Sequence, residues 1–223
     1  EDFTRLFNEN EALFKKYDLT AFEMETYIAF RYFLEKKPDI CIIECGMGGE
    51  IDATNVFDPI LAIITSVSLE HTGYLGRTLS EIALSKAGIM RPGRPVLTGV
   101  IPETARTVIA DVAARYDSHF RQVSDYHFPI YNDGIMTFAL ESHEGLKLKT
   151  DAVYQMRNAS LAVTAIDMLK KDFPFILANE NQLKGEILIN GIDIKEYNIC
   201  DEKGYFKINH YIQKSLEHVI SAV

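Results

Sequence analysis

The sequence predicts an α/β protein in which a mostly parallel sheet is flanked by helices and carries antiparallel strands at its edge. The first observation concerns residues 20 to 123, where two kinds of segment alternate. Short apolar runs typical of buried strands are followed by helical segments of roughly ten to fifteen residues. The second is a change of pattern between residues 127 and 151, where alternating runs flank the hairpin-type turn Asn132 to Gly134. We therefore expect parallel strands first and antiparallel strands after them.

Two helices are expected before the first strand. Residues 1 to 18 carry apolar side chains at helical spacing. Thr20 and Glu23 have the spacing of a capping box, in which each side chain bonds to the other residue's backbone amide. The helix that starts there should end near Lys36, because Pro38 follows.

The parallel sheet is expected from the next hundred residues. Asp39 to Glu44 reads as the first strand and Leu61 to Val67 as the second, since runs apolar on both faces are typical of parallel sheets. The further predicted elements are a helix from Thr78 or Ser80 to about Met90, a strand over Pro95–Val100, a helix from Pro102 to about Tyr116 and a strand over Phe120–Val123.

Antiparallel strands and a long helix follow. Residues 134–140 and 145–150 read as strands, and 153–171 as a strong helix. Residues 186–194 read as a hairpin with Asn-Gly at its turn, and 208–223 as an amphipathic helix. We expect residues 1–171 to form one domain, with 172–223 as a further segment of it or an unassigned tail.

Composition and charge exclude several classes of function. The 223 residues are 47% apolar and 25% charged, as in an ordinary soluble domain with a sizeable core. The net charge of −9 argues against nucleic acid or an anionic membrane as a general partner. No apolar run reaches the ~20 residues of a membrane span, and no signal sequence opens the chain. We therefore expect a cytoplasmic protein.

The cysteines indicate a reducing compartment. Cys41, Cys45 and Cys200 form an odd, sparse set rather than a disulfide scaffold. Cys41 and Cys45 would share one face of the predicted strand, where small core residues are the favoured interpretation over a pair of metal ligands.

A glycine-rich turn follows the first predicted strand. Gly46, Gly48 and Gly49 would let backbone amides approach a ligand closely. The spacing lacks the third glycine of a dinucleotide fingerprint, and no helix pattern follows directly. A tight turn without a ligand is the alternative.

Glu44 and His71 follow the first two predicted strands, so both should lie at one edge of the sheet. Each alone could be an ordinary hydrogen-bonded residue, whereas together they could hold a divalent cation. Mg²⁺ prefers oxygen ligands, and Mn²⁺ accepts oxygen or imidazole nitrogen.

Lys86 lies among apolar neighbours on a predicted helix. It could be a lysine whose stem covers apolar surface while its amine reaches water. Alternatively, burial could lower its pKa, and the neutral amine could react with carbon dioxide to give a carbamate that supports a metal.

Six motifs in the right order resemble the central domain of the folylpolyglutamate synthase/dihydrofolate synthase family of the Mur ligase superfamily. The resemblance covers about Leu19 to Lys170 and implies a fold related to P-loop NTPases. The motifs are Thr20 to Glu23, Glu44 to Val56, Ile64 to Thr72, Leu75 to Ala83, Lys86 to Ile89 and Gln155 to Ala162.

The resemblance implies an ATP-dependent amide ligase of folate metabolism, and we expect the protein to be a monomer. ATP would activate the carboxylate of folate or dihydropteroate as an acyl phosphate, and the amine of glutamate would attack it. By position, Glu44 and His71 would bind Mg²⁺, with Mn²⁺ as an alternative, and His71 would take part in catalysis with a carbamylated Lys86. Asn158 would contact the nucleotide. The folate or pterin site would be lined by Thr20, Phe22, Glu23, Asp52 and Ala53.

The sequence departs from this family in three respects. It has no G-x-x-x-x-G-K-[ST] phosphate loop, which in the family precedes the helix that starts at Thr20. The family's C-terminal domain is not recognisable, and 186–194 resembles a stretch that the family carries before that helix. Glu70 stands where the family has Asp, and Ser85 where it has Glu. A truncated ligase is therefore expected. The alternatives are a catalytically dead module that binds a folate-like ligand or a protein partner, and, more weakly, a Rossmann oxidoreductase.

Overall fold

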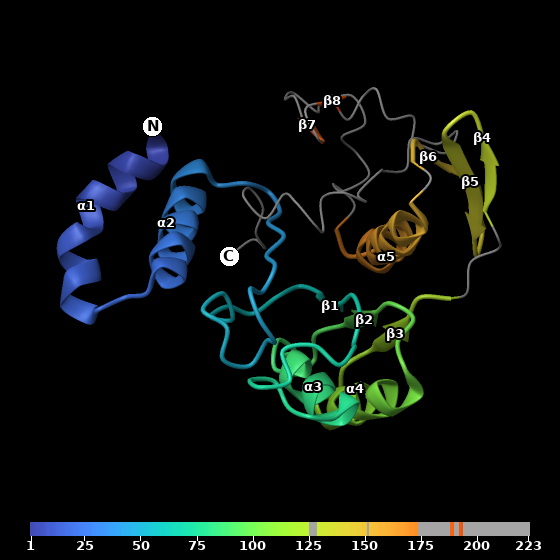
Figure 1. Ribbon diagram of the computed structural model, residues 1–223, viewed down its shortest axis with the longest axis horizontal. Coiled ribbons are helices and arrows are strands. Elements are labelled where there is room, and N and C mark those ends of the chain that lie inside the picture. Colours follow the sequence, from blue (N-terminus) through green and yellow to red (C-terminus); the bar gives the residue numbers. More distant parts are fainter. Residues whose placement is uncertain (125–128, 151, 174–187, 190–191, 194–223) are drawn as a thin grey trace.

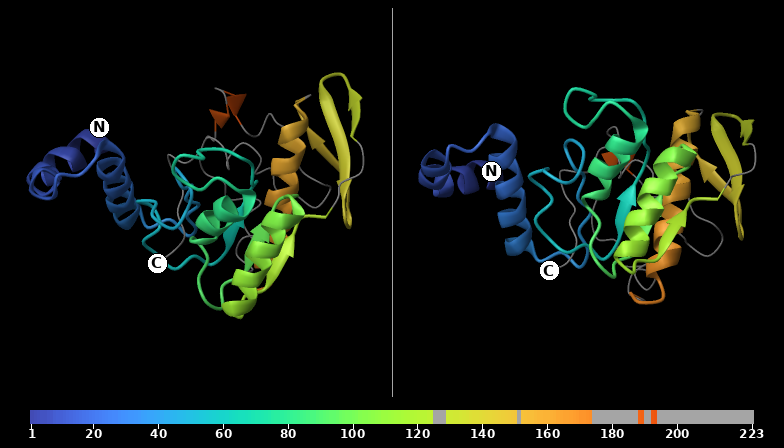
Figure 2. Two further views of the ribbon diagram at one scale, coloured as in Figure 1. Left: turned by 60° about the horizontal axis from the view of Figure 1, so that its bottom comes forward. Right: turned by 90° about the horizontal axis from the view of Figure 1, so that it is seen from below.

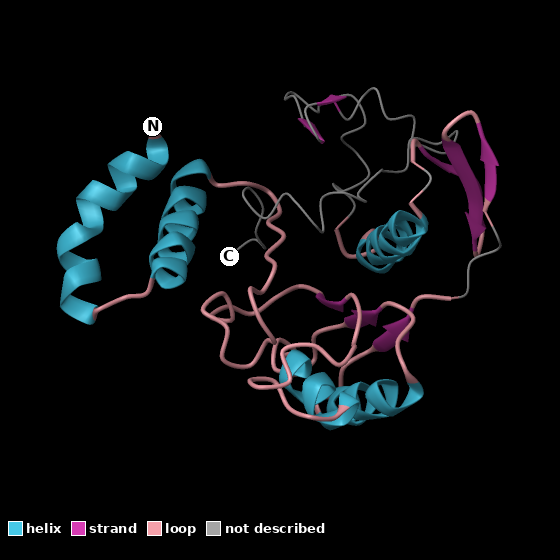
Figure 3. Cartoon of the chain, viewed as in Figure 1, coloured by secondary structure: helices cyan, strands magenta, loops and turns pink. Residues whose placement is uncertain are grey.

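The computed structural model describes residues 1–124, 129–150, 152–173, 188–189 and 192–193 (Figure 1). It has a parallel sheet, an antiparallel sheet and flanking helices, which confirms the predicted α/β fold (Figure 3). None of the described helices is long and apolar enough to cross a membrane.

Two N-terminal helices, α1 (Asp2–Tyr17) and α2 (Ala21–Lys36), pack against each other to one side of the sheet (Figures 1 and 2). The predicted capping box begins α2: the Thr20 hydroxyl accepts from the Glu23 amide, and the Glu23 carboxylate accepts from the Thr20 amide at 2.8 Å. These helices share a small core of their own around Leu6, Phe14 and Ile28.

The parallel sheet has the order β1 (Ala62–Ile64), β2 (Val96–Thr98) and β3 (Phe120–Gln122). Helices α3 (Leu79–Ala87) and α4 (Glu103–Arg115) cover one face, and α5 (Val153–Leu169) lies on the other (Figure 1). Alternate residues of β2 enter different cores, as strand geometry requires. Val96 packs with α3 and α4, and Leu97 packs with α5 and the antiparallel sheet.

The predicted antiparallel strands are present as β4 (Ile130–Asn132), β5 (Ile135–Leu140) and β6 (His143–Leu148). They form a sheet of their own rather than continuing the parallel one, because their apolar residues pack onto α5. The short pair β7 (Leu188–Ile189) and β8 (Ile192–Asp193) is antiparallel, as expected for 186–194. The helix predicted over 208–223 lies outside the described residues.

The prediction of a strand over Asp39 to Glu44 is wrong for the described structure. The chain runs from α2 to the glycine-rich turn without strand pairing. The physical reason is the absence of a neighbour: within the described ranges, no backbone hydrogen bond joins Ile42 to Glu44 to another segment. An apolar run becomes a strand only when another strand completes its ladder.

Candidate functional site

A cavity of about 460 Å³, here called the central cavity, lies between the Ile40–Gly48 segment, β1 and α5. Glu44, His71 and Lys86 all line it, although they come from three separate parts of the chain. The three side chains that the sequence singled out for metal chemistry therefore share one cavity.

Lys86 forms an ion pair with Glu70, with 3.0 Å between the lysine Nζ and a carboxylate oxygen. The Lys86 side chain is only 19% exposed, so this pair is partly shielded from water. The hydrogen bond from Lys86 holds the pKa of Glu70 below its usual value. Glu70 thus belongs to the site, a role that sequence reasoning missed because it read this residue only as a substitution beside His71.

The Glu44 carboxylate can be reached by water, yet its surroundings are apolar enough that burial raises its pKa. Within the described residues it has no hydrogen bond or ion pair. An ionised carboxylate in such a place is stabilised by a cation. His71 is exposed and has a left-handed backbone with φ of 48°.

Glu44 and His71 together offer two donors to a metal, fewer than a closed protein cage needs. No group of three or more His, Cys, Asp or Glu side chains is arranged around a common point within the described ranges. Mg²⁺ commonly keeps several waters and takes one or two protein carboxylates together with substrate phosphates. The donor set therefore fits an open, substrate-completed site rather than a structural metal site.

The glycine-rich turn is held by Asp52 and by close packing on α3. The Asp52 carboxylate accepts from the Met47 amide at 2.9 Å and from the Thr54 hydroxyl at 2.6 Å. A Cβ on Gly49 would lie within 3 Å of the Lys86 and Ser85 carbonyl oxygens. Gly49 is therefore required for packing against the end of α3, next to Lys86.

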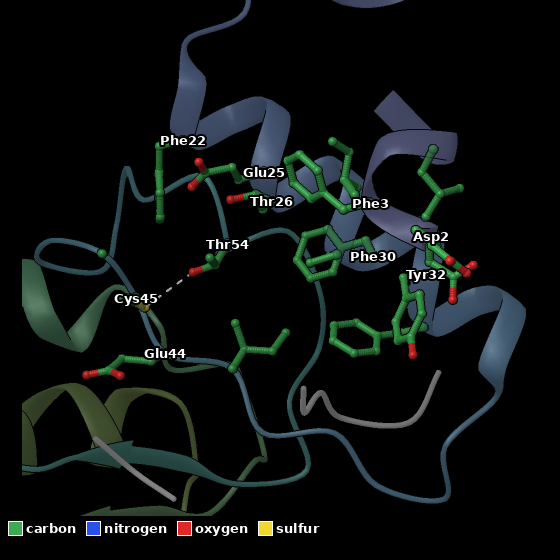
Figure 4. A pocket seen from close by; sticks show the side chains of 17 residues that line it. Asp2, Phe3, Phe22, Glu25, Thr26, Phe30, Tyr32, Glu44, Cys45 and Thr54 are labelled. Carbon is green, nitrogen blue, oxygen red and sulfur yellow. Dashed lines mark hydrogen bonds between the residues drawn. The ribbon is translucent and has the colours of Figure 1, made fainter. Parts of the chain in front are cut away.

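A second cavity of about 1080 Å³, here called the α2 cavity, lies between α1, α2 and the turn (Figure 4). Phe22 reaches from α2 over Gly46, where an added Cβ would lie 2.7 Å from the ring. In Figure 4 the Glu44 carboxylate points away from the aromatic side chains of this cavity. The aromatic lining residues are Phe3, Phe22, Phe30, Tyr32 and Phe33.

The residues expected in the folate site are only partly gathered at the α2 cavity. Phe22 lines it, whereas Thr20 and Glu23 bond to each other in the capping box, and Asp52 and Ala53 are not lining residues. Polar lining residues that the sequence analysis did not assign to this site are Glu25, Thr26, Cys45 and Thr54. For Thr26 the available signal was its position four residues after Phe22, which places the two residues on one face of a helix.

Asn158 lies on α5 and lines neither cavity. Its side-chain Nδ2 is buried without a hydrogen-bond partner among the described residues. A buried amide donor without a partner costs free energy unless a ligand or water accepts from it. The structure therefore leaves this donor available but does not bring it to Glu44 and His71.

Comparison with known proteins identifies similar sequences. No family model matches the sequence. The folylpolyglutamate synthase of Lacticaseibacillus casei is 33% identical over 177 residues, which cover 76% of this chain and 41% of that protein. The dihydrofolate synthase/folylpolyglutamate synthase of Bacillus subtilis is 34% identical over 187 residues, covering 77% and 43%. The chain thus spans about two fifths of the length of these relatives.

Solved structures agree with the sequence comparison. An FPGS–AMPPCP–folate complex superposes with a TM-score of 0.67 at 30% identity, over 74% of this chain and 42% of that one. The Mycobacterium tuberculosis folylpolyglutamate synthase, complexed with ADP and AMPPCP, gives a TM-score of 0.68 at 26% identity, over 76% and 43%.

Proposed function

This chain belongs, by sequence and structural homology, to the folylpolyglutamate synthase/dihydrofolate synthase family of Mur ligases, and we propose that it forms part of an ATP-dependent amide ligase. The observation that carries the proposal is the meeting of Glu44, His71 and Lys86 at one cavity beside a glycine-rich turn. The ligase would join glutamate to the carboxylate of folate or dihydropteroate.

The reaction has two steps. ATP transfers its γ-phosphoryl group to the substrate carboxylate, which gives an acyl phosphate and ADP. The amine of glutamate then attacks the acyl carbon, and phosphate leaves as the amide forms. Glu44 and His71 would hold Mg²⁺, or Mn²⁺ in its place, and a metal held there would supply neutralisation of charge for phosphoryl transfer.

Lys86 would act as a carbamate. For this its amine must lose a proton and leave Glu70, with which it pairs in the structure. Carbon dioxide then forms a carbamate whose negative charge favours a nearby cation. The Glu70 carboxylate would hold the amine in place until that exchange and would repel the carbamate once it forms.

The substrate and nucleotide would occupy separate surfaces. The aromatic lining of the α2 cavity suits a flat ring system such as a pterin, which can stack on Phe22. Thr20, Glu23, Asp52 and Ala53 would support this site from the capping box and the turn. The unpartnered Nδ2 of Asn158 could donate to a ring nitrogen of adenine.

We further propose that residues 1–171 form the central-domain portion of this ligase, with 172–223 as an additional segment. The protein would act in the cytoplasm as a monomer. Its relatives are more than twice as long as the matched region, so further parts of the site would come from polypeptide beyond that region.

A catalytically dead module that binds a folate-like ligand or a protein partner is the second candidate. It is favoured by the absence of a G-x-x-x-x-G-K-[ST] loop from the 223 residues. Such a loop supplies the amides and the lysine that bind ATP phosphates, and without them nucleotide affinity should be low.

Calorimetry with ATP and Mg²⁺, followed by an assay of ADP release with folate or dihydropteroate and glutamate, separates the candidates. For the ligase we expect Mg²⁺-dependent nucleotide binding that His71→Ala weakens by about tenfold or more. His119→Ala is the matched control, because His119 is also exposed but lies before β3. Unchanged binding by His71→Ala would remove the metal role, and no Mg²⁺-dependent binding by the wild type would favour the dead module.

A further inference from the structure

One face of α2 lines the α2 cavity, and an acidic residue interrupts this mostly aromatic and apolar face. Its members recur at the three- and four-residue spacing of one side of a helix, and they are Phe22, Glu25, Thr26, Ala29, Phe30 and Phe33. A carboxylate contributes no apolar burial to such a face. The position of Glu25 is therefore explained better by contact with a ligand than by packing of the helix.

The Glu25 side chain differs from the other two acidic side chains of α2, which both have partners. Glu23 accepts from the Thr20 amide in the capping box, and Glu35 forms an ion pair with Arg5 at 2.6 Å. The Glu25 side chain makes no hydrogen bond or ion pair to any residue that the structure describes. Its two carboxylate oxygens are therefore available to accept hydrogen bonds from a ligand.

The surroundings of Glu25 suit a flat ligand. Figure 4 shows Phe22, Glu25 and Thr26 together at one end of the cavity. Phe22 is 43% exposed, and its ring extends over Gly46, which has no side chain to obstruct it. An exposed aromatic ring offers a face on which another ring system can stack. A molecule stacked there would present one of its edges to the Glu25 carboxylate, which comes from the same turn of α2.

The remaining acidic residues of the α2 cavity are less suited to that edge. In Figure 4 the Glu44 carboxylate points away from the aromatic side chains. Glu1 and Asp2 come from the start of α1, and Asp2 lies at the opposite end of the cavity from Phe22 in the same view. Among the acidic lining residues of the described chain, Glu25 is therefore the one that a ligand stacked on Phe22 would meet.

A pterin ring has an edge that is complementary to a carboxylate. Its 2-amino group and the neighbouring ring N–H are both donors, and they point in nearly the same direction. The two oxygens of a carboxylate can accept one hydrogen bond each from such a pair, as they do from the paired N–H groups of arginine. A side-chain amide offers only one acceptor oxygen beside an NH₂ donor. Recognition of this edge therefore requires an acid rather than an amide.

We infer that Glu25 is a specificity-determining residue of the α2 cavity, and that its carboxylate accepts hydrogen bonds from the 2-amino group and the adjacent N–H of the pterin ring. The ring stacks on Phe22 in this arrangement. Heterocycles that lack the two donors leave the carboxylate without partners and bind more weakly. The inference rests on the proposed function, because it takes the α2 cavity as the site of the pterin.

The test compares two ligands in calorimetric titrations of the 223-residue protein. The first is pteroate, which carries the pterin edge, and the second is its 2-desamino-2-methyl analogue, in which a methyl group replaces the amino group. The wild type should bind the analogue about ten- to a hundredfold more weakly than pteroate, because a hydrogen bond to a charged group is lost.

A substitution at Glu25 shows whether this residue reads the amino group. Glu25→Gln should weaken pteroate binding by about ten- to a hundredfold, and the two ligands should then differ by less than about threefold, since the amino group and the carboxylate act as a pair. Glu11→Gln is the matched control and should leave both affinities unchanged. Glu11 is exposed on α1, pairs with Lys15 and does not line the cavity.

Three outcomes would overturn the inference. Equal binding of the two ligands by the wild type is the first, and it needs no substitution, so it decides the result even if Glu25→Gln does not fold. The second is a Glu25→Gln variant that binds pteroate as well as the wild type or loses affinity for both ligands equally. The third is a wild type that binds neither ligand. The third also removes the pterin site of the proposed function, whereas the first two remove the role of Glu25 alone.

Discussion

Two apolar runs, Ile40–Glu44 and Leu61–Thr65, differ in the structure although their sequences predict the same element. The second contains β1, which pairs with β2 in register from Ala62 to Ile64. The first pairs with no described strand. The runs have similar length and similar apolar content, so intrinsic preference does not explain the difference.

The difference lies in what surrounds each run. Ala62 and Ile64 are each only 3% exposed and belong to the core under α3 and α4. Ile42 and Ile43 are half-buried, both line the central cavity, and Ile43 also lines the α2 cavity. An apolar segment therefore forms a strand only when a second segment pairs with it. The following predictions compare the paired region, which contains β1 and β2, with other parts of the molecule.

The largest effect should come from truncating the centre of the paired region. Leu97 on β2 is fully buried between the parallel sheet and α5. Leu97→Ala should lower the free energy of unfolding by about 3 kcal/mol, because it removes apolar contacts and leaves a cavity. Ile42→Ala should cost less than about half of that, since its side chain already borders empty space. Urea unfolding of both variants measures the difference, and equal costs would contradict the comparison.

A close approach of backbones at the end of the paired strands gives the second effect. A Cβ on Gly99 would lie 2.3 Å from the Thr65 carbonyl oxygen, which is backbone and cannot move aside easily. Gly99→Ala should cost about 1–3 kcal/mol by overpacking. Gly73→Ala is the matched control, because nothing lies within 4 Å of its added Cβ. A neutral Gly99→Ala variant in urea unfolding would show that β1 and β2 are less tightly fixed than the structure indicates.

Most of the fold could be predicted from local signals in the sequence. The capping box at Thr20, the cap at Thr78, which was one of two predicted starts of that helix, and the turn before Gly134 follow from side-chain chemistry over three or four residues. The α/β order followed from the alternation of apolar runs with helical segments. These features depend on neighbours in the sequence, which a reader of the sequence can see.

What could not be predicted depends on contacts between distant segments. The failure of Asp39–Glu44 to form a strand depends on a neighbour, and so does the pairing of Lys86 with Glu70. Only the placement of Glu44 and His71 at one edge was expected from the rule for parallel strands, and both line one cavity with Lys86, which lies on α3. Their roles, and those of Asn158 and the residues expected in the folate site, stay predictions.

Substitutions at helix caps should show whether the paired region, which includes α3, unfolds together with helices α1 and α2. Thr78 caps α3 in the paired region: its hydroxyl accepts from the Glu81 amide at 3.2 Å. Thr78→Ala should lower the free energy of global unfolding by about 1 kcal/mol, and Thr78→Ser, which keeps the hydroxyl, should restore most of it. Thr20→Ala removes the matching cap from α2, whose core with α1 is separate. Its effect should appear mainly as faster amide exchange within α2, and an equal loss in global unfolding would mean that the regions are coupled.

The smallest effect should come from an ion pair that ties β3 to the turn between β5 and β6. Arg121 bonds to the Glu141 carboxylate, which also accepts from the Ser124 hydroxyl at 2.6 Å, and the hydrogen bond from Arg121 holds the pKa of Glu141 below its usual value. A lowered pKa in the folded state means that the carboxylate stabilises the fold above its unfolded pKa of about 4.3. This stability is lost as the pH falls through the lower, folded value. Glu141→Gln should therefore cost less than about 1 kcal/mol at pH 7.

The loss of stability caused by Glu141→Gln should disappear at acid pH, where the wild-type Glu141 carboxylate is protonated. Urea unfolding at neutral and acid pH measures this, with Glu144→Gln as the control because Glu144 is exposed on β6 outside the ion pair. A cost that persists at low pH would mean that Glu141 acts through its shape, for example through its left-handed backbone with φ of 52°, and not through its charge. In that case apolar packing, and not this ion pair, would join the paired region to the antiparallel sheet, and the stability of the protein would not change with pH at this site.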